Sequence, residues 1–379
     1  MNCQKKLIHL KIKICIRILN NMKFNNWIED INRIFIPRPT KEVNKRFDMS
    51  ERTIDFSDKF FNRFMDTITQ EDIITYPSYA DYENLKKDIA FYNNVEIDNV
   101  YLSTGSDVCI KSLCEITMQS GFNIVSNVPC FPMYGIYASF YGGEHIGVEY
   151  QNVTEFSLEY LMESVNDKTR LVVVANPNSP IGDYKTIDEL REVCKFLNDR
   201  NIIFLIDEAY VDFSPGTVLP LIHEYDNVAI SRTFSKAFGA AGIRVGYLLA
   251  SKKLTEVVTK VQLTYPISGV SLKFASFLLN NFGEVDEYIN QSILGRERLC
   301  NFLEVSDYDV VRSHTNSIHF HESFNDNSET ISKLRKEGFR FKSGEKKTGT
   351  PVKIPGDDRE TWIRLSFGPN IDEIIGDII

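Results

Sequence analysis

Short hydrophobic runs recur along the middle of the chain and alternate with longer segments of helical pattern. The runs are residues 123–129, 170–177, 201–210, 227–234 and 246–251. Each is rich in β-branched residues and ends in polar or turn-forming residues, as buried strands do. Nearly continuous hydrophobic strands separated by helices predict an α/β fold, with a large domain whose mostly parallel sheet is flanked by helices.

One of the intervening segments has a clear helix start. Residues 186–200 read TIDELREVCKFLNDR, in which Thr186 and Glu189 have the spacing of a capping box. This pattern predicts a helix that begins just after Thr186.

The pattern changes from about residue 275 onward. One long helix is expected to start there, and strands are expected around 308–321, 339–342 and 362–367, with a helix near 328–337. This order is typical of a smaller α+β domain. We therefore predict a large domain over residues 71–274 and a small C-terminal domain over 275–379. Residues 22–70 are predicted to form an N-terminal arm that contributes to the small domain.

Composition and charge narrow the class of protein. The chain has 379 residues, of which 43% are hydrophobic, so it can bury the cores of two domains. Its formal net charge is -9, with scattered acidic residues, and an extended phosphate backbone is therefore not expected as a partner. We expect a small-molecule substrate and no nucleic acid.

The N-terminal segment differs from the rest of the chain. The first 23 residues contain six basic residues and no acidic residue. Lysines interrupt the apolar run and no small-residue cleavage site follows, which argues against a signal peptide. The segment is also too short and too charged to span a membrane. We interpret residues 1–21 as a leader that is either disordered or not translated, in which case the protein starts at Met22.

Cysteine and histidine residues suggest neither disulfides nor a metal site. The seven cysteines form no CxxC pair, and their odd number indicates reduced thiols and a cytoplasmic protein. Alternation along HTNSIHFH places His319 and His321 on one face of a strand, close to His314. No acidic residue or cysteine completes this set at readable spacing, so no metal is expected.

The candidate chemistry lies where the hydrophobic runs end. In open α/β sheets, ligands bind beyond the carboxyl ends of the strands. After one such end, the segment SRTFSKAFGAAGIRVG contains Lys236, with Thr233 and Ser235 before it and Arg244 after it. A lysine amine can conjugate with a carbonyl, while hydroxyl donors and an arginine fork suit a phosphate. The segment predicts a phosphorylated aldehyde held next to Lys236.

A second strand end supplies a carboxylate and a phenol. Asp207 follows an apolar run, where a carboxylate is costly unless it meets a cation. A protonated pyridine nitrogen is such a cation, and the charged ring accepts electrons when a bond to the α-carbon of the substrate breaks. Tyr210 lies three residues further on and can reach the ring hydroxyl.

Three segments together resemble a known family. SRTFSKAFGAAGIRVG, DEAY and NPNSPIG, in this order and spacing, are similar to the class I/II aminotransferases of pyridoxal 5'-phosphate (PLP) fold type I. The resemblance is closest to the histidinol-phosphate aminotransferases and extends from about Tyr76 to Gly368. Each motif alone is a weak signal, but the three together are specific. The resemblance implies PLP as cofactor.

The resemblance also assigns roles to the residues that bind the cofactor. Lys236 would form the covalent link to the cofactor and Asp207 would pair with the pyridine nitrogen. Thr233, Ser235 and Arg244 would hold the phosphate.

Further roles follow from the segments STGSD and FPMYGIY. Gly105, Ser106 and Asp107 would help to hold the phosphate at a helix start, which suits an anion. Tyr134 would stack on the cofactor ring. Tyr76 in TYPSY resembles the tyrosine that reaches the phosphate in the neighbouring subunit, which implies a homodimer.

Three departures from the family pattern lie on the substrate side. The asparagine expected before the second proline of NPNSPIG is Ser179, and we give a slight preference to Asn178 as the residue that contacts the ring hydroxyl. Arg364 in WIRLSFG matches the arginine that grips an anionic substrate group. The arginine expected after GFRF is Lys342, which cannot copy a bidentate fork, with Arg340 two residues earlier. Residues 57–60 replace the Asn-Glu-Asn-Pro element of the family.

These departures imply that cofactor chemistry is retained and that the substrate is not necessarily histidinol phosphate. The leading hypothesis is transfer of an amino group, with glutamate as the expected donor, to a small phosphorylated keto or aldehyde acceptor. The alternatives are a decarboxylase of a phosphorylated amino acid, of the threonine-phosphate or serine-phosphate type, and a PLP-binding protein without turnover.

Overall fold

The computed structural model describes residues 25–31, 46–325, 328–336, 341–343, 354–359 and 362–378. By its contacts the chain divides into two units, residues 1–34 and residues 35–379. The described part of the first unit contains one short helix, α2 (Asn26–Glu29). The predicted leader, residues 1–21, lies outside the described residues. All other described helices and strands belong to the second unit.

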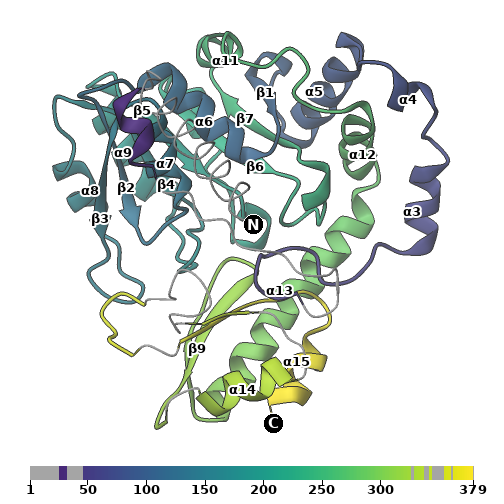
Figure 1. The fold of residues 1–379 in the computed structure, drawn as a ribbon, viewed down its shortest axis with the longest axis vertical. Helices are drawn as coiled ribbons and strands as arrows, with labels where there is room; N and C mark the ends of the chain where they lie inside the picture. The colour runs from purple at the N-terminus through teal and green to yellow at the C-terminus, as the bar shows by residue number, and fades with distance from the viewer. Residues whose placement is uncertain are drawn as a thin grey trace, which may run out of the picture. The chain divides into compact units, whose positions relative to one another are not determined.

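A seven-stranded sheet forms the centre of the larger part of this unit (Figure 1). Its strands are β1 (Val100–Ser103), β2 (Asn123–Val128), β3 (Glu144–Glu149), β4 (Thr169–Ala175), β5 (Ile203–Asp207), β6 (Val228–Thr233) and β7 (Gly246–Ala250). Their order across the sheet is β1-β7-β6-β5-β4-β2-β3. The strands from β3 to β6 pair in parallel, whereas β7 is antiparallel to both β6 and β1. The prediction of an α/β fold with a mostly parallel sheet is confirmed.

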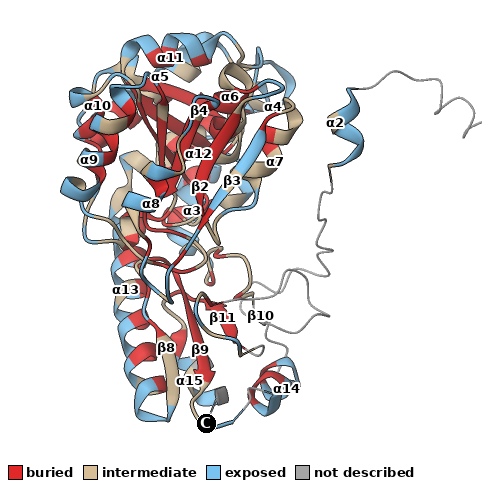
Figure 2. Ribbon diagram, turned by 90° about the vertical axis from the view of Figure 1, so that its left-hand side faces the viewer, coloured by how far each residue is buried: buried red, intermediate tan, exposed pale blue. Residues whose placement is uncertain are grey.

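Both faces of this sheet are buried by helices. The helices around it are α5 (Tyr79–Asn93), α6 (Ser106–Thr117), α7 (Met133–Phe140), α8 (Leu158–Glu163), α9 (Ile187–Asn198), α10 (Leu221–Glu224), α11 (Lys252–Thr259) and α12 (Gly269–Asn280). Along β4, Val172 and Val174 belong to one hydrophobic cluster, while Leu171 and Val173 belong to another. This alternation explains why the strands are hydrophobic at nearly every position, and Figure 2 shows β2 and β4 as buried.

The predicted capping box is present at the start of α9. Thr186 accepts a hydrogen bond from the backbone of Glu189, and the Glu189 carboxylate accepts one from the backbone of Thr186 at 2.7 Å. The sequence therefore located this helix start correctly.

The prediction of one long helix from residue 275 is wrong in one respect. The segment forms two helices, α12 and α13 (Phe282–Val305), which meet at Asn281. The backbone of Asn281 has φ -130° and ψ 44°, outside the helical region. Its side chain donates to the carbonyl of Phe277 at 2.9 Å, which suits the end of α12. Hydrophobic periodicity continues across this break, so the pattern alone did not reveal it.

A four-stranded antiparallel sheet forms the smaller part of the unit. It contains β8 (Tyr308–Val311), β9 (Ser317–Glu322), β10 (Lys342–Ser343) and β11 (Ile363–Ser366), in the order β10-β11-β9-β8. Helices α13, α14 (Ser328–Lys336) and α15 (Ile371–Ile378) accompany it (Figure 1). The predicted strands near 308–321 and 362–367 and the predicted helix near 328–337 are confirmed. Of the strand expected at 339–342, residues 339 and 340 lie outside the described residues.

The segment before the large sheet contributes to this smaller core. Phe47 is completely buried in the same hydrophobic cluster as Ile318, Phe320 and Leu365, and its carbonyl accepts a hydrogen bond from the backbone of Ser366 at 2.7 Å. Further along, the chain forms α3 (Asp58–Met65) and α4 (Glu71–Ile74). The described residues also include three short 3₁₀ helices: η2 (Ile97–Asn99), η3 (Val211–Phe213) and η4 (Ala241–Ile243). The domain boundaries given above stay predictions.

None of the helices in the described ranges combines the length and the apolar character that crossing a membrane would require.

Candidate active site

A cavity of about 480 Å³ lies at the carboxyl ends of the parallel strands. Strands β5 and β6 end at Asp207 and Thr233, and both of these residues line the cavity. The other predicted site residues in its lining are Ser106, Asp107, Tyr134, Tyr210, Ser235, Lys236 and Arg244. The fold thus brings together four segments that are far apart in the sequence, at the edge where α/β sheets bind ligands.

Asp207 is the buried carboxylate of the cavity. Its two oxygens accept hydrogen bonds from the hydroxyls of Tyr134, at 2.7 Å, and of Ser231, at 2.8 Å. Burial raises the pKa of Asp207 above its ordinary value, although these two hydrogen bonds favour the ionised form. A cationic ligand atom near this carboxylate would restore the charged state.

Tyr134 has a different contact from the predicted one. Its side chain is completely buried, and its hydroxyl donates a hydrogen bond to Asp207. The neighbouring Phe131 also lines the cavity and remains 39% exposed, so this ring offers its surface to a ligand. Sequence reasoning missed Phe131, because both aromatic residues occur in FPMYGIY and the sequence does not tell which ring is buried.

Lys236 lies on the side of the cavity next to the segment that contains Met49 and Glu51. Its Nζ donates to the carbonyl of Met49 at 3.0 Å and lies 5.5 Å from the centre of the Tyr210 ring. Met49 and Glu51 line the cavity as well, and no sequence motif indicates either residue. Residues 57–60, which we expected on the substrate side, instead start helix α3, where the Ser57 hydroxyl donates to Glu284 at 2.7 Å. None of these four residues lines the cavity.

Two positive charges act on the Tyr210 hydroxyl. Burial alone would raise the pKa of Tyr210, but the charges of Lys236 and Arg364 and hydrogen bonds with Ser179 and Ser50 outweigh it and lower the pKa to about 7. The phenol therefore loses its proton near neutral pH.

This shift is measurable in the cofactor-free protein. We expect one tyrosine to ionise near pH 7 in an ultraviolet absorbance titration, and Tyr210→Phe to remove that step. Since the pKa is depressed on folding, its stabilising contribution is full above the ordinary tyrosine pKa of about 10 and is lost as the pH falls through about 7. A titration step near pH 7 that persists in Tyr210→Phe would contradict the assignment.

The predicted phosphate-binding residues form one connected group. The Thr233 hydroxyl donates to Ser235 Oγ at 3.0 Å, and Arg244 Nη1 donates to the same oxygen at 3.3 Å. Thr233, Ser235 and Arg244 all line the cavity. Hydroxyls and a guanidinium in this arrangement can surround an anionic group.

The start of α6 lies directly against this group. Gly105 precedes the helix with φ +79°, and a Cβ there would come within 2.7 Å of Arg244 Nη2. A Cβ at Gly246 would come within 2.2 Å of the backbone nitrogen of Ser106. Glycine is thus required for the close approach of the helix start to Arg244. Asp107, in the first turn, has a buried Oδ1 for which the described residues provide no hydrogen-bond partner.

The preference for Asn178 over Ser179 is corrected. Asn178 is buried, and its side-chain nitrogen donates to the carbonyl of Pro129 at 3.1 Å and to the Tyr150 hydroxyl at 2.6 Å. Asn178 is not part of the cavity lining. Ser179, in contrast, lines the cavity and accepts a hydrogen bond from Arg364 Nη2 at 3.0 Å.

Arg364 and Lys342 lie beside the cavity on adjacent strands of the small sheet. Arg364 is buried, and its Nε donates to Ser317 Oγ at 3.3 Å. Lys342 is directly opposite Arg364 in the pairing of β10 with β11. Burial and the charge of Arg364 lower the pKa of Lys342 to about 8. Arg340 lies outside the described residues.

Comparison with known proteins decides the family. The family model for aminotransferases of class I and II matches residues 54–374. This chain belongs to the class I and II aminotransferases. The resemblance drawn from the three segments is confirmed, and the family supports a transaminase.

Relatives of the aminotransferase include several histidinol-phosphate aminotransferases. The protein of that name from Ruminiclostridium cellulolyticum is 32% identical over 61% of this chain and 65% of its own length, so the match spans somewhat less than two thirds of that relative. The one from Caldanaerobacter subterraneus is 29% identical over 72% of this chain and 77% of its own length.

Solved structures share the fold at low identity. The histidinol-phosphate aminotransferase from Sinorhizobium meliloti, in complex with pyridoxal-5'-phosphate, has a TM-score of 0.76 and 21% identity, and the match covers 94% of this chain and 95% of that one. L-threonine-O-3-phosphate decarboxylase from Porphyromonas gingivalis has a TM-score of 0.70 and 16% identity, with 88% and 97% covered. These likenesses show that the aminotransferase has fold type I.

Tyr76 is not part of the cavity in this aminotransferase chain. It is 78% exposed and stacks on Tyr265 with 4.6 Å between the ring centres. Its role in a neighbouring subunit stays a prediction.

In the described part of the aminotransferase, no three histidine, cysteine or acidic side chains are grouped so that they could hold a metal ion. The cysteines described there, Cys109, Cys114, Cys130, Cys194 and Cys300, are free thiols.

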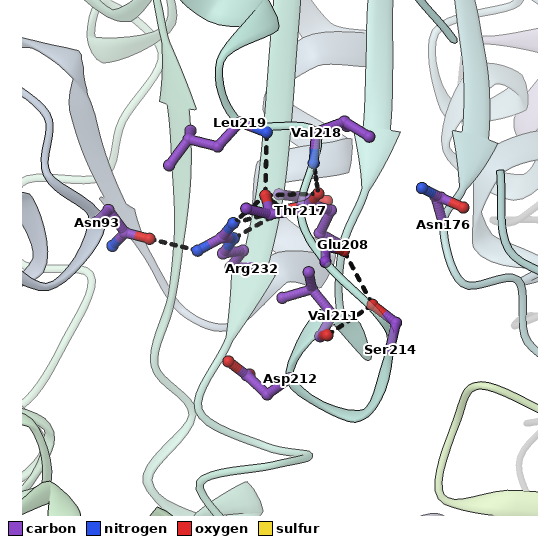
Figure 3. Close-up of polar contacts among 12 residues, drawn as sticks. Asn93, Asn176, Glu208, Val211, Asp212, Ser214, Thr217, Val218, Leu219 and Arg232 are labelled. Carbon is purple, nitrogen blue, oxygen red and sulfur yellow. Dashed lines mark hydrogen bonds and ion pairs between the residues drawn. The ribbon is translucent and has the colours of Figure 1, made fainter. Parts of the chain in front are cut away.

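A buried ion pair supports the strand that carries Asp207. The next residue, Glu208, accepts hydrogen bonds from the guanidinium of Arg232 at 2.7 and 2.9 Å and from the backbone of Val218 at 2.7 Å. Figure 3 shows Arg232 between Asn93 on one side and Thr217 and Glu208 on the other. Glu208 directly follows β5, and Arg232 lies on β6. The ion pair therefore links the ends of these two strands next to the cavity.

Breaking this pair is expected to destabilise the protein strongly. Glu208→Gln leaves the charge of Arg232 buried without its counter-ion, which costs about 3–5 kcal/mol of unfolding free energy. Urea denaturation would measure this loss. The matched control is Glu224→Gln, which breaks the more exposed ion pair with Arg191 and should cost at most about 1 kcal/mol. Equal losses in the two variants would contradict a special role for Glu208.

Proposed function

We propose that this chain is a PLP-dependent transaminase that takes an amino group from an amino acid donor, with glutamate as the expected donor. The acceptor is a small keto or aldehyde compound that carries a phosphate. The observation that supports this most directly is one cavity that holds an amine, Lys236, a buried carboxylate, Asp207, and a connected group of phosphate-type donors at Thr233, Ser235 and Arg244. Family membership and the cofactor of the Sinorhizobium meliloti structure agree with it.

The residues of the cavity fit PLP. The volume of about 480 Å³ lies within the range of small-molecule sites, about 300–1,000 Å³. The buried carboxylate of Asp207 would face the protonated pyridine nitrogen. Glycines at 105 and 246 keep the space in which the start of α6 and Arg244 approach each other, as a phosphate site requires. When bound, PLP supplies an electron-accepting ring for the bond that breaks at the α-carbon of the substrate.

The side chains around the cavity then have distinct roles. Lys236 Nζ would hold the cofactor aldehyde, and the same amine could move a proton at the α-carbon of the substrate. Asp207 would hold the proton on the ring nitrogen. Tyr210, whose pKa is about 7, exchanges a proton at its hydroxyl, near Lys236 Nζ. Phe131 is better placed than Tyr134 to stack on the ring, since Tyr134 is committed to Asp207.

We further propose that the active unit is a homodimer in the cytoplasm. A group of large apolar side chains is exposed before and at the start of α5: Ile73 is 71% exposed, Ile74 77%, Tyr76 78% and Tyr79 75%. Burial of this group against a second copy would remove apolar surface from water and would bring Tyr76 towards the site of the partner. The free thiols in the described residues agree with a reducing compartment.

The half-reaction with glutamate tests the function. Protein loaded with PLP is mixed with glutamate, and the absorbance of the cofactor and the 2-oxoglutarate released are both measured. We expect the aldehyde form of the cofactor to convert to the amine form, with one 2-oxoglutarate per active site.

Other outcomes of this test would favour the alternatives. A decarboxylase would be favoured if a phosphorylated amino acid released carbon dioxide and glutamate formed no 2-oxoglutarate. The structural similarity to the Porphyromonas gingivalis decarboxylase is the reason to test this alternative. A cofactor spectrum that stays constant with every amino donor would indicate a PLP-binding protein without turnover.

A further inference from the structure

The small sheet has two unlike faces, and both are buried. On one face, Ile318 and Phe320 of β9 and Ile363 and Leu365 of β11 belong to the hydrophobic core of this part of the fold. The alternate positions of the same strands form the other face. They are polar, although all of them are buried: Ser317, His319, Arg364 and Ser366. Buried polar side chains normally have hydrogen-bond partners, and this face therefore calls for an explanation.

Three side chains that can donate hydrogen bonds form one row across this face. In the sheet register, Lys342 of β10 is opposite Arg364 of β11, and Arg364 is opposite His319 of β9. Directly opposite residues have Cβ atoms about 4.5–5.5 Å apart. Arg364 is thus the centre of a row, with an ammonium group on one side and an imidazole on the other.

His319 is the member of the row that lacks partners. Its side chain is completely buried, and neither ring nitrogen has a hydrogen-bond partner among the residues that the structure describes. Burial, together with the charges of Arg364 and Lys342, holds the pKa of His319 well below its ordinary value. The ring is therefore neutral at physiological pH and has one N–H to donate. A leucine or phenylalanine would fill this position without the desolvation of two nitrogens.

The row lies at the edge of the cavity. Arg364 Nη2 reaches Ser179 Oγ, and Ser179 lines the cavity. The charges of Arg364 and Lys236 both act on the Tyr210 hydroxyl. A substrate attached near Lys236 could therefore extend an anionic group past Ser179 towards the row.

We propose that His319 donates a hydrogen bond to the phosphate group of the substrate, next to Arg364 and Lys342, and that this donor distinguishes phosphate from a carboxylate. This inference rests on the proposed function and specifies the substrate side of the same site. A carboxylate has two oxygens in one plane, and a single guanidinium can satisfy both of them. A phosphate group is tetrahedral and has three terminal oxygens, so it can accept hydrogen bonds from donors on all three neighbouring strands. Asp48 partly offsets the charge of Lys342, so the discrimination depends on hydrogen bonds as well as on charge.

The experiment compares two anions on protein whose cofactor site is filled. PLP is first fixed by borohydride reduction, so that added phosphate cannot occupy the Thr233–Ser235–Arg244 group. Inorganic phosphate and acetate are then titrated by calorimetry. We expect wild-type protein to bind phosphate at least about tenfold more tightly than acetate, and His319→Leu to lose about tenfold in phosphate affinity, as for the loss of one hydrogen bond to a charged group. Acetate affinity should change less than about twofold, since no donor to acetate is removed.

Two further variants make the result decisive. His319→Phe also removes both nitrogens and replaces His319→Leu should the leucine variant fail to fold. His321→Gln is the matched control, because His321 lies two residues further along β9 and its ring already bonds the carbonyl of Glu322 at 2.6 Å. This control should bind both anions as wild type does.

Thermal denaturation adds an independent readout. If His319 is kept for binding and not for packing, the melting temperature of the phosphate-free His319→Leu protein should equal or exceed that of wild type. Unchanged phosphate affinity in the variants, equal losses for phosphate and acetate, or a lower melting temperature would overturn the proposal. If borohydride fixes no cofactor at all, the proposed function fails, and this inference fails with it.

Discussion

Asp207→Asn is expected to lower turnover with glutamate about a thousandfold and to leave PLP bound. The substitution keeps the shape of the side chain, and the amide oxygen can still accept one of the two hydrogen bonds that Tyr134 and Ser231 donate. It removes the charge that would hold a proton on the pyridine nitrogen. Loss of one partner from a buried ion pair costs about 3–5 kcal/mol, and about 4 kcal/mol in the activation free energy corresponds to a thousandfold in rate. Steady-state turnover and the single-turnover half-reaction would both show the loss.

Ser231→Ala is the matched control for this prediction. It removes one of the two hydroxyl bonds to Asp207 and leaves the carboxylate in place. We expect a loss of about tenfold to a hundredfold, because one hydrogen bond to a charged group contributes about 1.5–3 kcal/mol. If Asp207→Asn retains wild-type turnover, the carboxylate does not face the ring nitrogen.

Lys236→Ala is expected to abolish the covalent attachment of PLP and to lower turnover by about 10⁴-fold or more. Both the amine that binds the aldehyde and the group that moves the proton at the α-carbon are lost, and positioned proton transfer alone contributes about 10²–10⁴-fold. The phosphate-binding residues remain, so PLP should still bind, although reversibly. Dialysis followed by absorbance spectroscopy measures this change in retention.

The control for Lys236 is a lysine with a purely surface contact. The side chain of Lys252 is 64% exposed and pairs with Asp98 at 2.7 Å, and neither residue lines the cavity. Lys252→Ala should keep the covalent cofactor and full turnover. Covalent PLP in Lys236→Ala would show that another amine carries the cofactor.

The sequence was sufficient for five of the seven strands of the large sheet, for its mostly parallel character and for the cofactor side of the cavity, whereas β1 and β3 were not predicted. Strands such as β4 are buried on both faces, which makes their hydrophobic runs continuous and easy to recognise. Asp207 and Thr233 are the last residues of two such strands, so the topology alone brings them to one edge. The order and spacing of the three motif segments indicated the family.

Orientation of single side chains could not be predicted from the sequence. In FPMYGIY both Phe131 and Tyr134 are aromatic, and only the fold shows that Tyr134 is turned to Asp207 while Phe131 stays exposed. In NPNSPIG, adjacent residues point in opposite directions: Asn178 bonds Tyr150, and Ser179 lines the cavity. One-residue differences of this kind depend on backbone direction, which pattern and composition do not report.

Contacts between distant segments were also invisible in the sequence. Met49 and Glu51 line the cavity because the segment before α3 lies against it, and no local motif indicates this. His319 was considered only as a metal ligand with His321, since strand alternation places both on one face. Its position beside Arg364 follows from the pairing of β9 with β11, which the sequence does not specify.

The most direct test of the central claim is the site of cofactor attachment. The purified protein is incubated with PLP, reduced with borohydride, digested, and analysed by peptide mass spectrometry. The account predicts that the reduced cofactor is found on the peptide that contains Lys236, and on that lysine within it. Absence of any modified peptide, or modification of a different lysine alone, would contradict it.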